Sequence, residues 1–307
     1  MNDLITILGV TATGKTKLAV ALAGLLDGEI ISADSRQVYK GMDIGTGKDL
    51  AEYEYNGVKI PYHLINIVQP GYEYNVYEFY RDFFNAYDEI VSREKMPIMC
   101  GGSGMYLDAV IRGYKLDKVP VNKNLRNELE SMDNAELIDK LSSYGRPLHN
   151  VTDTQDRERL IRAIEIADFE QRNAGFNKSP RQVNSINFGI RFDRETIRSR
   201  ITDRLHDRLE NGMLDEVKTL LGSGLSPDQL MFYGLEYKYL TMHLTGEISY
   251  NEMFNLLNTA IHQFAKRQMT WFRRMEKNGV KIHWIDGNID LDSKLMVVMG
   301  VLRNFQG

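Results

Sequence analysis

The feature that most restricts the fold of this chain is a glycine-rich pattern near its start. Residues 9–16 read GVTATGKT and match the pattern G-x-x-x-x-G-K-[ST]. A short apolar, β-branched run precedes the pattern at residues 4–8, and a run rich in Ala and Leu follows it at residues 17–26. A strand, a glycine loop and a helix in this order place backbone N–H groups and a helix N-terminus around a polyphosphate. We therefore predict a strand–loop–helix unit that binds a polyphosphate, whose identity the pattern leaves open.

Two side chains of this loop have predicted roles of their own. Lys15 is expected to reach the terminal phosphates, and the Thr16 hydroxyl is expected to help hold Mg²⁺ beside them. The loop residues expected to bind the phosphates are Gly9, Thr11, Ala12, Thr13, Gly14, Lys15 and Thr16.

Composition narrows the class of protein. The chain has 307 residues, enough for one large domain or two smaller ones. Its net charge of −4 provides no general attraction to nucleic acid, so any such site needs a local concentration of Lys and Arg. The single cysteine, Cys100, excludes an intrachain disulfide and a cysteine-based zinc site. The first residues lack a basic segment, and no apolar run approaches about 18 residues, so we expect a cytoplasmic protein without a membrane segment.

Strand-like and helix-like runs alternate over residues 1–114. This alternation predicts an α/β fold of the P-loop NTPase type, a parallel sheet flanked by helices. Residues 115–185 lack strand signals and predict an all-helical insertion domain, after which residues 186–307 form the second, mostly helical part of the catalytic core. Strands are expected at residues 4–8, 29–32, 95–100, 186–192 and 280–285. Helices are expected at residues 17–26, 76–93, 124–132, 134–143, 156–171, 194–211, 213–221, 235–244, 250–275 and 292–305.

An acidic residue, Asp34, follows the second predicted strand. Ligands of parallel sheets bind beyond the carboxyl ends of the strands, so the phosphate loop, Asp34 and the glycine turn at residues 101–104 should converge. Three interpretations of Asp34 remain open. It binds Mg²⁺, it is a general base that takes a proton from an acceptor, or it only caps a turn or helix. Ser35 and the two residues after it add hydrogen-bonding groups that suit a polar ring.

The densest basic segment is residues 263–274, which contain four cations and no acid. At helical spacing Arg267, Trp271 and Arg274 share a face. This face either serves a phosphate or a nucleic acid, or it is solvated with Trp271 in the core; both interpretations remain open.

Two other segments carry basic residues. Residues 39–48 contain glycines and two lysines, which suggests a loop near anions, although such surface loops are common. In residues 194–208 acids alternate with the basic residues, a pattern typical of a salt-linked surface helix.

Six motifs, spread in order over nearly the whole chain, resemble those of the tRNA dimethylallyltransferases, also called tRNA isopentenyltransferases. Any one of these motifs could mislead, but all six in register make the resemblance specific. Residues 231–236 depart from the family, which usually has Gly-Tyr-[Lys/Arg] there with a preceding basic residue, and this leaves their role in RNA binding open. The six motifs are residues 9–19, 31–35, 41–46, 101–106, 159–165 and 265–271.

The resemblance implies a particular reaction. The dimethylallyl group of dimethylallyl diphosphate moves to N6 of the adenine on the 3′ side of a tRNA anticodon, and diphosphate leaves. Lys15 and Thr16, with Mg²⁺, would stabilise the leaving diphosphate. Asp34 would accept or orient the N6 proton, and Arg267 would clamp the diphosphate. These four residues form the catalytic group that the resemblance implies.

The resemblance also implies a surface that binds the tRNA anticodon stem-loop. The target adenine would leave its stack and enter a channel, where residues 34–37 read it and Ser103 lines the wall. The helical insertion would hold the stem-loop, mostly through phosphate contacts and stacking. The residues expected at the RNA are Asp34, Ser35, Arg36, Gln37, Ser103, Arg126, Glu158, Arg159, Leu160, Ile161 and Arg162.

Two other activities compete with this interpretation. Adenylate isopentenyltransferases perform the same chemistry on free AMP or ADP but have a reduced insertion, so the length of residues 115–183 favours tRNA. A small-molecule kinase on the same P-loop fold would instead turn over ATP in the presence of a small hydroxyl acceptor. The resemblance further implies a monomer.

Overall fold

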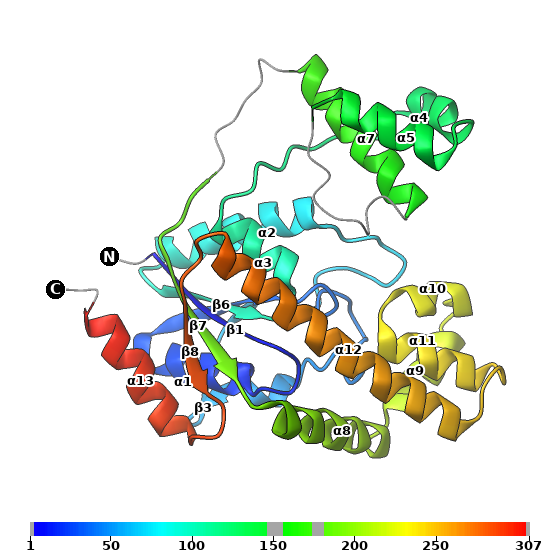
Figure 1. Ribbon diagram of the computed structural model, residues 1–307. Helices are drawn as coiled ribbons and strands as arrows, with labels where there is room; N and C mark the ends of the chain where they lie inside the picture. The colour runs from blue at the N-terminus through cyan, green and yellow to red at the C-terminus, as the bar shows by residue number, and fades with distance from the viewer. Residues whose placement is uncertain (1–2, 146–155, 174–180, 305–307) are drawn as a thin grey trace. The chain divides into compact units, whose positions relative to one another are not determined.

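The computed structural model describes residues 3–145, 156–173 and 181–304 (Figure 1). The chain forms two compact units, one of Met1–Tyr114 together with Arg181–Gly307 and the other of Lys115–Pro180. Within these described ranges, no helix combines the length and the apolar character needed to cross a bilayer.

A six-stranded parallel sheet lies at the centre of the larger unit. Its strands follow the order β5-β2-β6-β1-β7-β8, and every neighbouring pair is parallel. The predicted α/β fold with a parallel sheet is therefore confirmed. Because β6 lies between β1 and β2, the loops that follow these three strands leave the sheet side by side (Figure 1). The strands are β1 (Leu4–Gly9), β2 (Gly28–Ala33), β5 (Tyr62–His63), β6 (Met96–Gly101), β7 (Ser185–Arg191) and β8 (Ile282–Asp286).

Strand β1 shows why this sequence forms an interior strand. All six of its residues are buried, as expected for a parallel strand that is covered on both faces. Side chains alternate between the faces of a strand, and here Leu4 and Leu8 pack into one hydrophobic core while Ile5 and Ile7 pack into the other.

Helices cover both faces of the sheet (Figure 1). The helices α1 (Lys15–Leu26) and α13 (Leu291–Asn304) form one core with it. The other α-helices described in this unit form the core on the opposite face. They are α2 (Val76–Ser92), α3 (Gly104–Ile111), α8 (Arg194–Glu210), α9 (Met213–Gly222), α10 (Pro227–Phe232), α11 (Leu235–Leu244) and α12 (Tyr250–Lys277).

The sequence does not predict several short elements. The antiparallel pair β3 (Glu54–Tyr55) and β4 (Val58–Lys59), the edge strand β5 and the single turn η1 (Leu50–Glu52) are too short to show a periodicity. Helix α10 did carry a signal, because Ser226 forms a capping box with Gln229 and Pro227 occupies the first turn.

The smaller unit is helical in its described part. Its helices α4 (Lys123–Glu130), α5 (Asn134–Ser143) and α7 (Arg157–Arg172) bury a core of leucine, isoleucine and alanine side chains. The sequence places the end of the insertion at residue 185. The compact unit covers Lys115–Pro180. Ser185 belongs to the sheet, because it pairs with Leu4 as the first residue of β7.

Candidate active site

The phosphate-binding loop connects β1 to α1 and folds back on itself. Gly14, at the N-cap of α1, has φ +77°, and Ala12 has φ +62°. The Thr13 hydroxyl donates to the Val10 carbonyl oxygen over 2.9 Å and closes the loop. A Cβ atom on Gly9 would lie 2.8 Å from Thr13 Oγ1, so this close approach requires glycine.

Lys15 lies across its own loop. Its Nζ donates to the Val10 carbonyl oxygen over 3.4 Å. Burial lowers the pKa of Lys15, and the positive charges of Arg204 and Arg208 lower it further. A bound anion would favour the charged lysine and reverse this shift. In the part of the chain that is described, the Thr16 hydroxyl makes no hydrogen bond, so it remains available as a ligand beside the phosphates.

The residues after β2 form an acceptor loop, residues 34–37, that is tied to the glycine turn after β6. Asp34 Oδ1 accepts the Arg36 N–H over 2.9 Å, and its Oδ2 accepts no hydrogen bond from the described residues. The Ser103 hydroxyl accepts the Ser35 N–H over 3.0 Å, and the Ser103 N–H donates to the Ala33 carbonyl over 3.2 Å. The structure therefore brings Asp34, Ser35 and Ser103 together, as the sequence predicts.

Gln37 is engaged with its own unit through both ends of its amide. The Ser32 hydroxyl donates to Gln37 Oε1 over 3.0 Å, and Gln37 Nε2 donates to the Gly47 carbonyl over 3.1 Å. Gln37 therefore connects the acceptor loop to residues 41–48, which we call the 41–48 loop.

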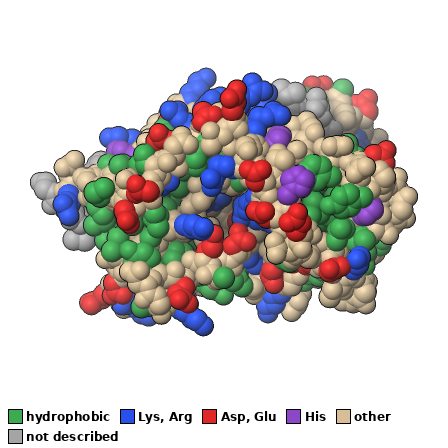
Figure 2. All heavy atoms as spheres, turned by 90° about the horizontal axis from the view of Figure 1, so that it is seen from below, with side chains coloured by type: hydrophobic (Ala, Val, Ile, Leu, Met, Phe, Trp, Pro, Cys, Tyr) green, Lys and Arg blue, Asp and Glu red, His purple; other side chains and the backbone are tan. Residues whose placement is uncertain are grey.

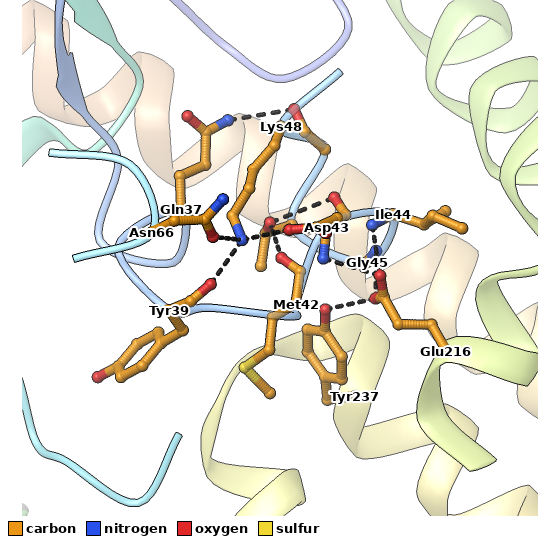
Figure 3. Close-up of polar contacts among 12 residues, drawn as sticks. Gln37, Tyr39, Met42, Asp43, Ile44, Gly45, Lys48, Asn66, Glu216 and Tyr237 are labelled. Carbon is orange, nitrogen blue, oxygen red and sulfur yellow. Dashed lines mark hydrogen bonds and ion pairs between the residues drawn. The ribbon is translucent and has the colours of Figure 1, made fainter. Parts of the chain in front are cut away.

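The 41–48 loop contains a buried lysine (Figure 3). The side chain of Lys48 has no exposed area. Its Nζ donates to the Tyr39 carbonyl over 2.5 Å, to Asp43 Oδ1 over 2.6 Å and to Asn66 Oδ1 over 2.6 Å. Burial lowers the pKa of Lys48, and Asp43 opposes this effect. The sequence suggests that Lys40 and Lys48 lie near anions. All three protons of Lys48, however, have oxygen acceptors within the chain.

A carboxylate from α9 holds the same loop (Figure 3). Glu216 Oε2 accepts the N–H groups of Asp43 and Ile44, each over 2.7 Å. Its Oε1 accepts the Gly45 N–H over 3.0 Å and the Tyr237 hydroxyl over 2.7 Å. Successive backbone N–H groups of this kind form an anion-binding nest, and here the anion is a side chain of the protein.

One face of α8 is directed at the phosphate-binding loop. Arg200 Nε donates to the Ala12 carbonyl over 2.9 Å, and Arg204 Nη2 forms an ion pair with Asp49 Oδ2 over 2.5 Å. Arg208 Nη2 lies 3.9 Å from the same Asp49 oxygen. These arginines are four residues apart and share a face. Arg204 and Arg208 thus form ion pairs, as expected for a salt-linked helix, but they do so with Asp49 of another loop, and this face also contacts the phosphate-binding loop.

Arg208 is the least satisfied of these cations. Its Nη2 atom is buried and has no hydrogen-bond acceptor in the described residues. Burial lowers the pKa of Arg208, and burial raises the pKa of Glu236, which lines the same small cavity with Thr11 and Arg204. The positive charge is local, because Figure 2 shows Lys and Arg side chains intermingled with Asp and Glu over the face seen from below.

Two side chains of the basic segment on α12, Arg267 and Trp271, differ in exposure. Arg267 is exposed, its guanidinium lies 5.9 Å from the centre of the Phe264 ring, and it forms no ion pair in the described ranges. Trp271 packs against the start of α3, where a Cβ atom on Gly104 would lie 2.4 Å from the indole. Trp271 is therefore packed against α3, as the second interpretation of the basic segment expects, while Arg267 is exposed and its role as a phosphate ligand stays a prediction.

In the smaller unit, two of the arginines expected at the RNA bind a buried carboxylate. Arg126 donates to Glu165 through Nε (3.1 Å) and Nη2 (3.0 Å), and Arg162 donates to it through Nη1 (3.1 Å). The Asn122 N–H also donates to Glu165 over 2.9 Å. These contacts lower the pKa of Glu165 against the opposing effect of its burial.

The other residues of this predicted RNA surface differ in exposure. Leu160 and Ile161 are buried in the core of the helical unit, which leaves only their backbone for contact with a ligand. The Arg159 side chain is 62% exposed and pairs with the preceding Asp156, while Glu158 lies 3.7 Å from Arg126. Of these residues, Arg159 and Glu158 are the most accessible.

Sequence reasoning missed the side chains that hold the loops from a distance. Glu216 and Gln268 lie far along the chain from the loops they contact. The arginines of α8 had a signal, because their spacing of four residues places them on one face.

Comparison with known proteins adds to this geometry. The profile of the IPP transferase family matches residues 37–275. The chain is 53% identical over 302 residues to a tRNA dimethylallyltransferase 1 of Parabacteroides distasonis, and 55% identical over 302 residues to a tRNA dimethylallyltransferase 2 of Phocaeicola vulgatus. Each alignment covers 98% of both proteins.

Solved structures give the same relationship. The chain is similar to the tRNA isopentenylpyrophosphate transferase of Bacillus halodurans, with 33% identity, a TM-score of 0.72 and coverage of 99% of this chain and 96% of that one. It is also similar to a eukaryotic dimethylallyltransferase acting on tRNA, with 26% identity, a TM-score of 0.75 and coverage of 94% and 74%. From its sequence, its fold and these relatives together, the chain belongs to the IPP transferase family.

Proposed function

We propose that this protein transfers the dimethylallyl group of dimethylallyl diphosphate to N6 of the adenine on the 3′ side of a tRNA anticodon. The observation that carries this proposal is the sheet order, in which the phosphate-binding loop and Asp34 follow β1 and β2 on either side of β6. A diphosphate and a nucleobase thus have neighbouring sites on one sheet edge. Curated relatives named tRNA dimethylallyltransferases support the choice of substrates.

The first task of the site is to accept the leaving group. As the bond between the adenine N6 and the allylic carbon forms, the bond from that carbon to the diphosphate oxygen breaks, and negative charge develops on the diphosphate. Lys15 and the N–H groups at the start of α1, which have no hydrogen-bond acceptor among the described residues, would donate to this charge. Arg267 has the exposure needed to hold the diphosphate from α12.

A divalent metal ion fits this site. The Thr16 hydroxyl has no hydrogen bond from the described residues, and hard cations prefer oxygen ligands, so this hydroxyl would hold the ion together with the diphosphate. We assign the ion as Mg²⁺, which when bound would neutralise part of the charge on the diphosphate.

The second task is to manage the N6 proton. Asp34 is held by the Arg36 N–H at Oδ1, which leaves Oδ2 to accept the proton from the amine or to orient it. Ser103 holds the neighbouring Ser35 N–H, so the acceptor loop keeps its shape when a base enters. Ser35, Arg36 and Gln37 follow Asp34 in the acceptor loop and would contact the adenine.

The helical unit would bind the anticodon stem-loop. Arg159 is exposed there, and Arg126 and Arg162 keep part of their guanidinium groups at the surface beside Glu165. Such cations position an RNA by contacts with its phosphates rather than by reading bases. A tRNA substrate would place the reaction in the cytoplasm.

The test is a labelled transfer assay. The protein is incubated with radiolabelled dimethylallyl diphosphate and Mg²⁺, in separate reactions with mixed tRNA, an anticodon stem-loop and AMP. We expect label on the RNA, located by nuclease digestion to the adenine next to the anticodon. Label on AMP alone would instead identify an adenylate isopentenyltransferase. A parallel reaction with ATP and small alcohols tests the kinase, and phosphoryl transfer without prenylation would overturn the proposal.

A further inference from the structure

One buried amide connects two loops of the candidate active site. Gln268, on α12, is 7% exposed. Its Oε1 accepts the Thr11 N–H of the phosphate-binding loop over 3.0 Å. Its Nε2 donates to the Gly102 carbonyl, in the glycine turn after β6, over 2.9 Å. Since Thr11 offers a donor and Gly102 an acceptor, only one orientation of the amide satisfies both contacts.

The contact at Gly102 is close on all sides. A Cβ atom on Gly102 would lie 2.5 Å from Gln268 Nε2 and 3.0 Å from the Gly9 carbonyl oxygen. The amide, the glycine turn and the start of the phosphate-binding loop therefore meet within van der Waals contact, and the turn has no room for a side chain at this position.

The glycine turn continues this connection to the acceptor side. Ser103, the residue after Gly102, accepts the Ser35 N–H over 3.0 Å and donates its own N–H to the Ala33 carbonyl over 3.2 Å. A path of hydrogen bonds thus runs from the phosphate-binding loop, through Gln268 and the glycine turn, to the loop that carries Asp34.

We propose that Gln268 is a positioning residue that sets the phosphate-binding loop at a fixed distance from the acceptor loop, so that the allylic carbon faces the adenine amine. This inference rests on the proposed function. Gln268 does not touch a substrate, because both of its polar atoms are bonded to backbone and its side chain is buried. Its effect is on the geometry of the reacting atoms, and a displacement of about 1 Å at such a site costs about a hundredfold in rate.

The test compares Gln268→Met with Gln263→Met under single-turnover conditions with enzyme in excess. Methionine keeps the length of the side chain but removes both hydrogen bonds. Gln263 lies on the same helix and is exposed, so its variant controls for the change of residue type. We expect Gln268→Met to lower the transfer rate constant by about ten- to a hundredfold, with the KM for tRNA within about twofold of wild type. Gln263→Met should match wild type in both.

A second variant reaches the same contact from the other partner. Gly102→Ala places a methyl group against Gln268 Nε2, and we expect the same loss of rate without a change in the KM for tRNA. If the two residues act through one contact, the losses in the double variant will be less than the product of the single losses. Gly102→Ala also keeps the proposal testable if Gln268→Met fails to fold.

Three results separate the possible failures. A wild-type protein that prenylates no tRNA overturns the proposed function itself. A wild-type protein that prenylates tRNA while Gln268→Met transfers at the same rate overturns only the role of Gln268. A lower melting temperature with an unchanged single-turnover rate constant would mean that the amide only stabilises the fold, and this also overturns the inference.

Discussion

The larger unit contains two glycine-rich loops that end in a lysine, and they are used in opposite ways. In the phosphate-binding loop, the Val10 carbonyl at 3.4 Å is the one hydrogen-bond partner of the Lys15 ammonium among the described residues. In the 41–48 loop, Lys48 is buried and donates to three oxygens of the chain (Figure 3). Three successive backbone N–H groups of the 41–48 loop donate to the carboxylate of Glu216, which lies on α9.

The difference shows what makes a glycine loop a binding site. Both loops offer N–H groups and an ammonium, which together attract an anion. The 41–48 loop receives its anion from Glu216 on α9, so its donors are already satisfied. In the phosphate-binding loop the Thr11 N–H donates to the neutral amide of Gln268, but no carboxylate among the described residues takes that place, and we expect a diphosphate to do so.

The largest expected effect on the transfer rate comes from removing the ammonium of Lys15 in the phosphate-binding loop. We expect Lys15→Met to lower the rate of prenyl transfer to tRNA by about a hundred- to a thousandfold, since Lys15 donates to the charge that develops on the diphosphate. Single-turnover transfer of labelled dimethylallyl groups measures this loss. The control is Lys17→Met on the same helix, whose side chain is 68% exposed, and it should transfer at the wild-type rate. Equal rates for both variants would show that the loop is not the site of the diphosphate.

A smaller loss of transfer rate is expected from a change in the acceptor loop. Asp34→Asn keeps an oxygen for the Arg36 N–H but removes the proton acceptor. We expect a loss of rate of about a hundredfold, with tRNA affinity nearly unchanged, when filter binding and single-turnover transfer are measured on the same preparation. If affinity and rate fall together, Asp34 holds the adenine and does not take its proton.

The sequence predicts the phosphate-binding loop better than the contacts of the 41–48 loop, for a physical reason. The phosphate-binding loop is defined by local residues: the spacing of Gly9, Gly14 and Lys15 and the strand and helix on either side. The contacts that fill the 41–48 loop come from Glu216, and no pattern within residues 39–48 reports a partner so far along the chain.

The same reasoning applies to the helices. Long helices such as α12 show their period in the sequence, and the prediction of residues 250–275 agrees closely with Tyr250–Lys277. The period places Gln268 in the buried stripe with Ala265 and Phe272 and leaves Arg267 outside it, but it does not tell which backbone groups the buried amide meets. Local patterns therefore predicted the long elements and the strand–loop–helix unit, whereas the side chains that support this loop depend on tertiary contacts.

Removing the charge of Glu216 from the 41–48 loop should lower the stability of the fold more than it affects diphosphate binding. Glu216→Gln removes the charge that accepts four donors, and an amide can satisfy only part of them. We expect a loss of about 2 kcal/mol in the free energy of unfolding, measured by urea denaturation, with an unchanged affinity for inorganic diphosphate. Glu210→Gln, at an exposed position on α8, is the matched control and should unfold like wild type. A Glu216→Gln variant as stable as this control would contradict the comparison.

The smallest expected effect is a pH dependence that separates the two lysines. Burial lowers the pKa of both Lys15 and Lys48 below the ordinary value of 10.5. A folded pKa below the unfolded one means that the unfolded chain binds more protons in this interval, so both groups make the fold more stable as the pH rises toward 10.5. Only Lys15 is expected to meet a ligand, and a bound diphosphate favours its protonated form.

Affinity should therefore change in the direction opposite to stability. As the pH rises through the pKa of Lys15, the affinity for inorganic diphosphate should fall, by at most about tenfold per pH unit. Calorimetric titrations at a series of pH values below 10.5 measure this slope. Lys15→Met serves as the reference that removes the titration of diphosphate itself, and Lys48 is unaltered in both proteins. The same slope in wild type and Lys15→Met would show that the diphosphate does not contact this lysine, and the two glycine loops would then no longer differ in the way proposed.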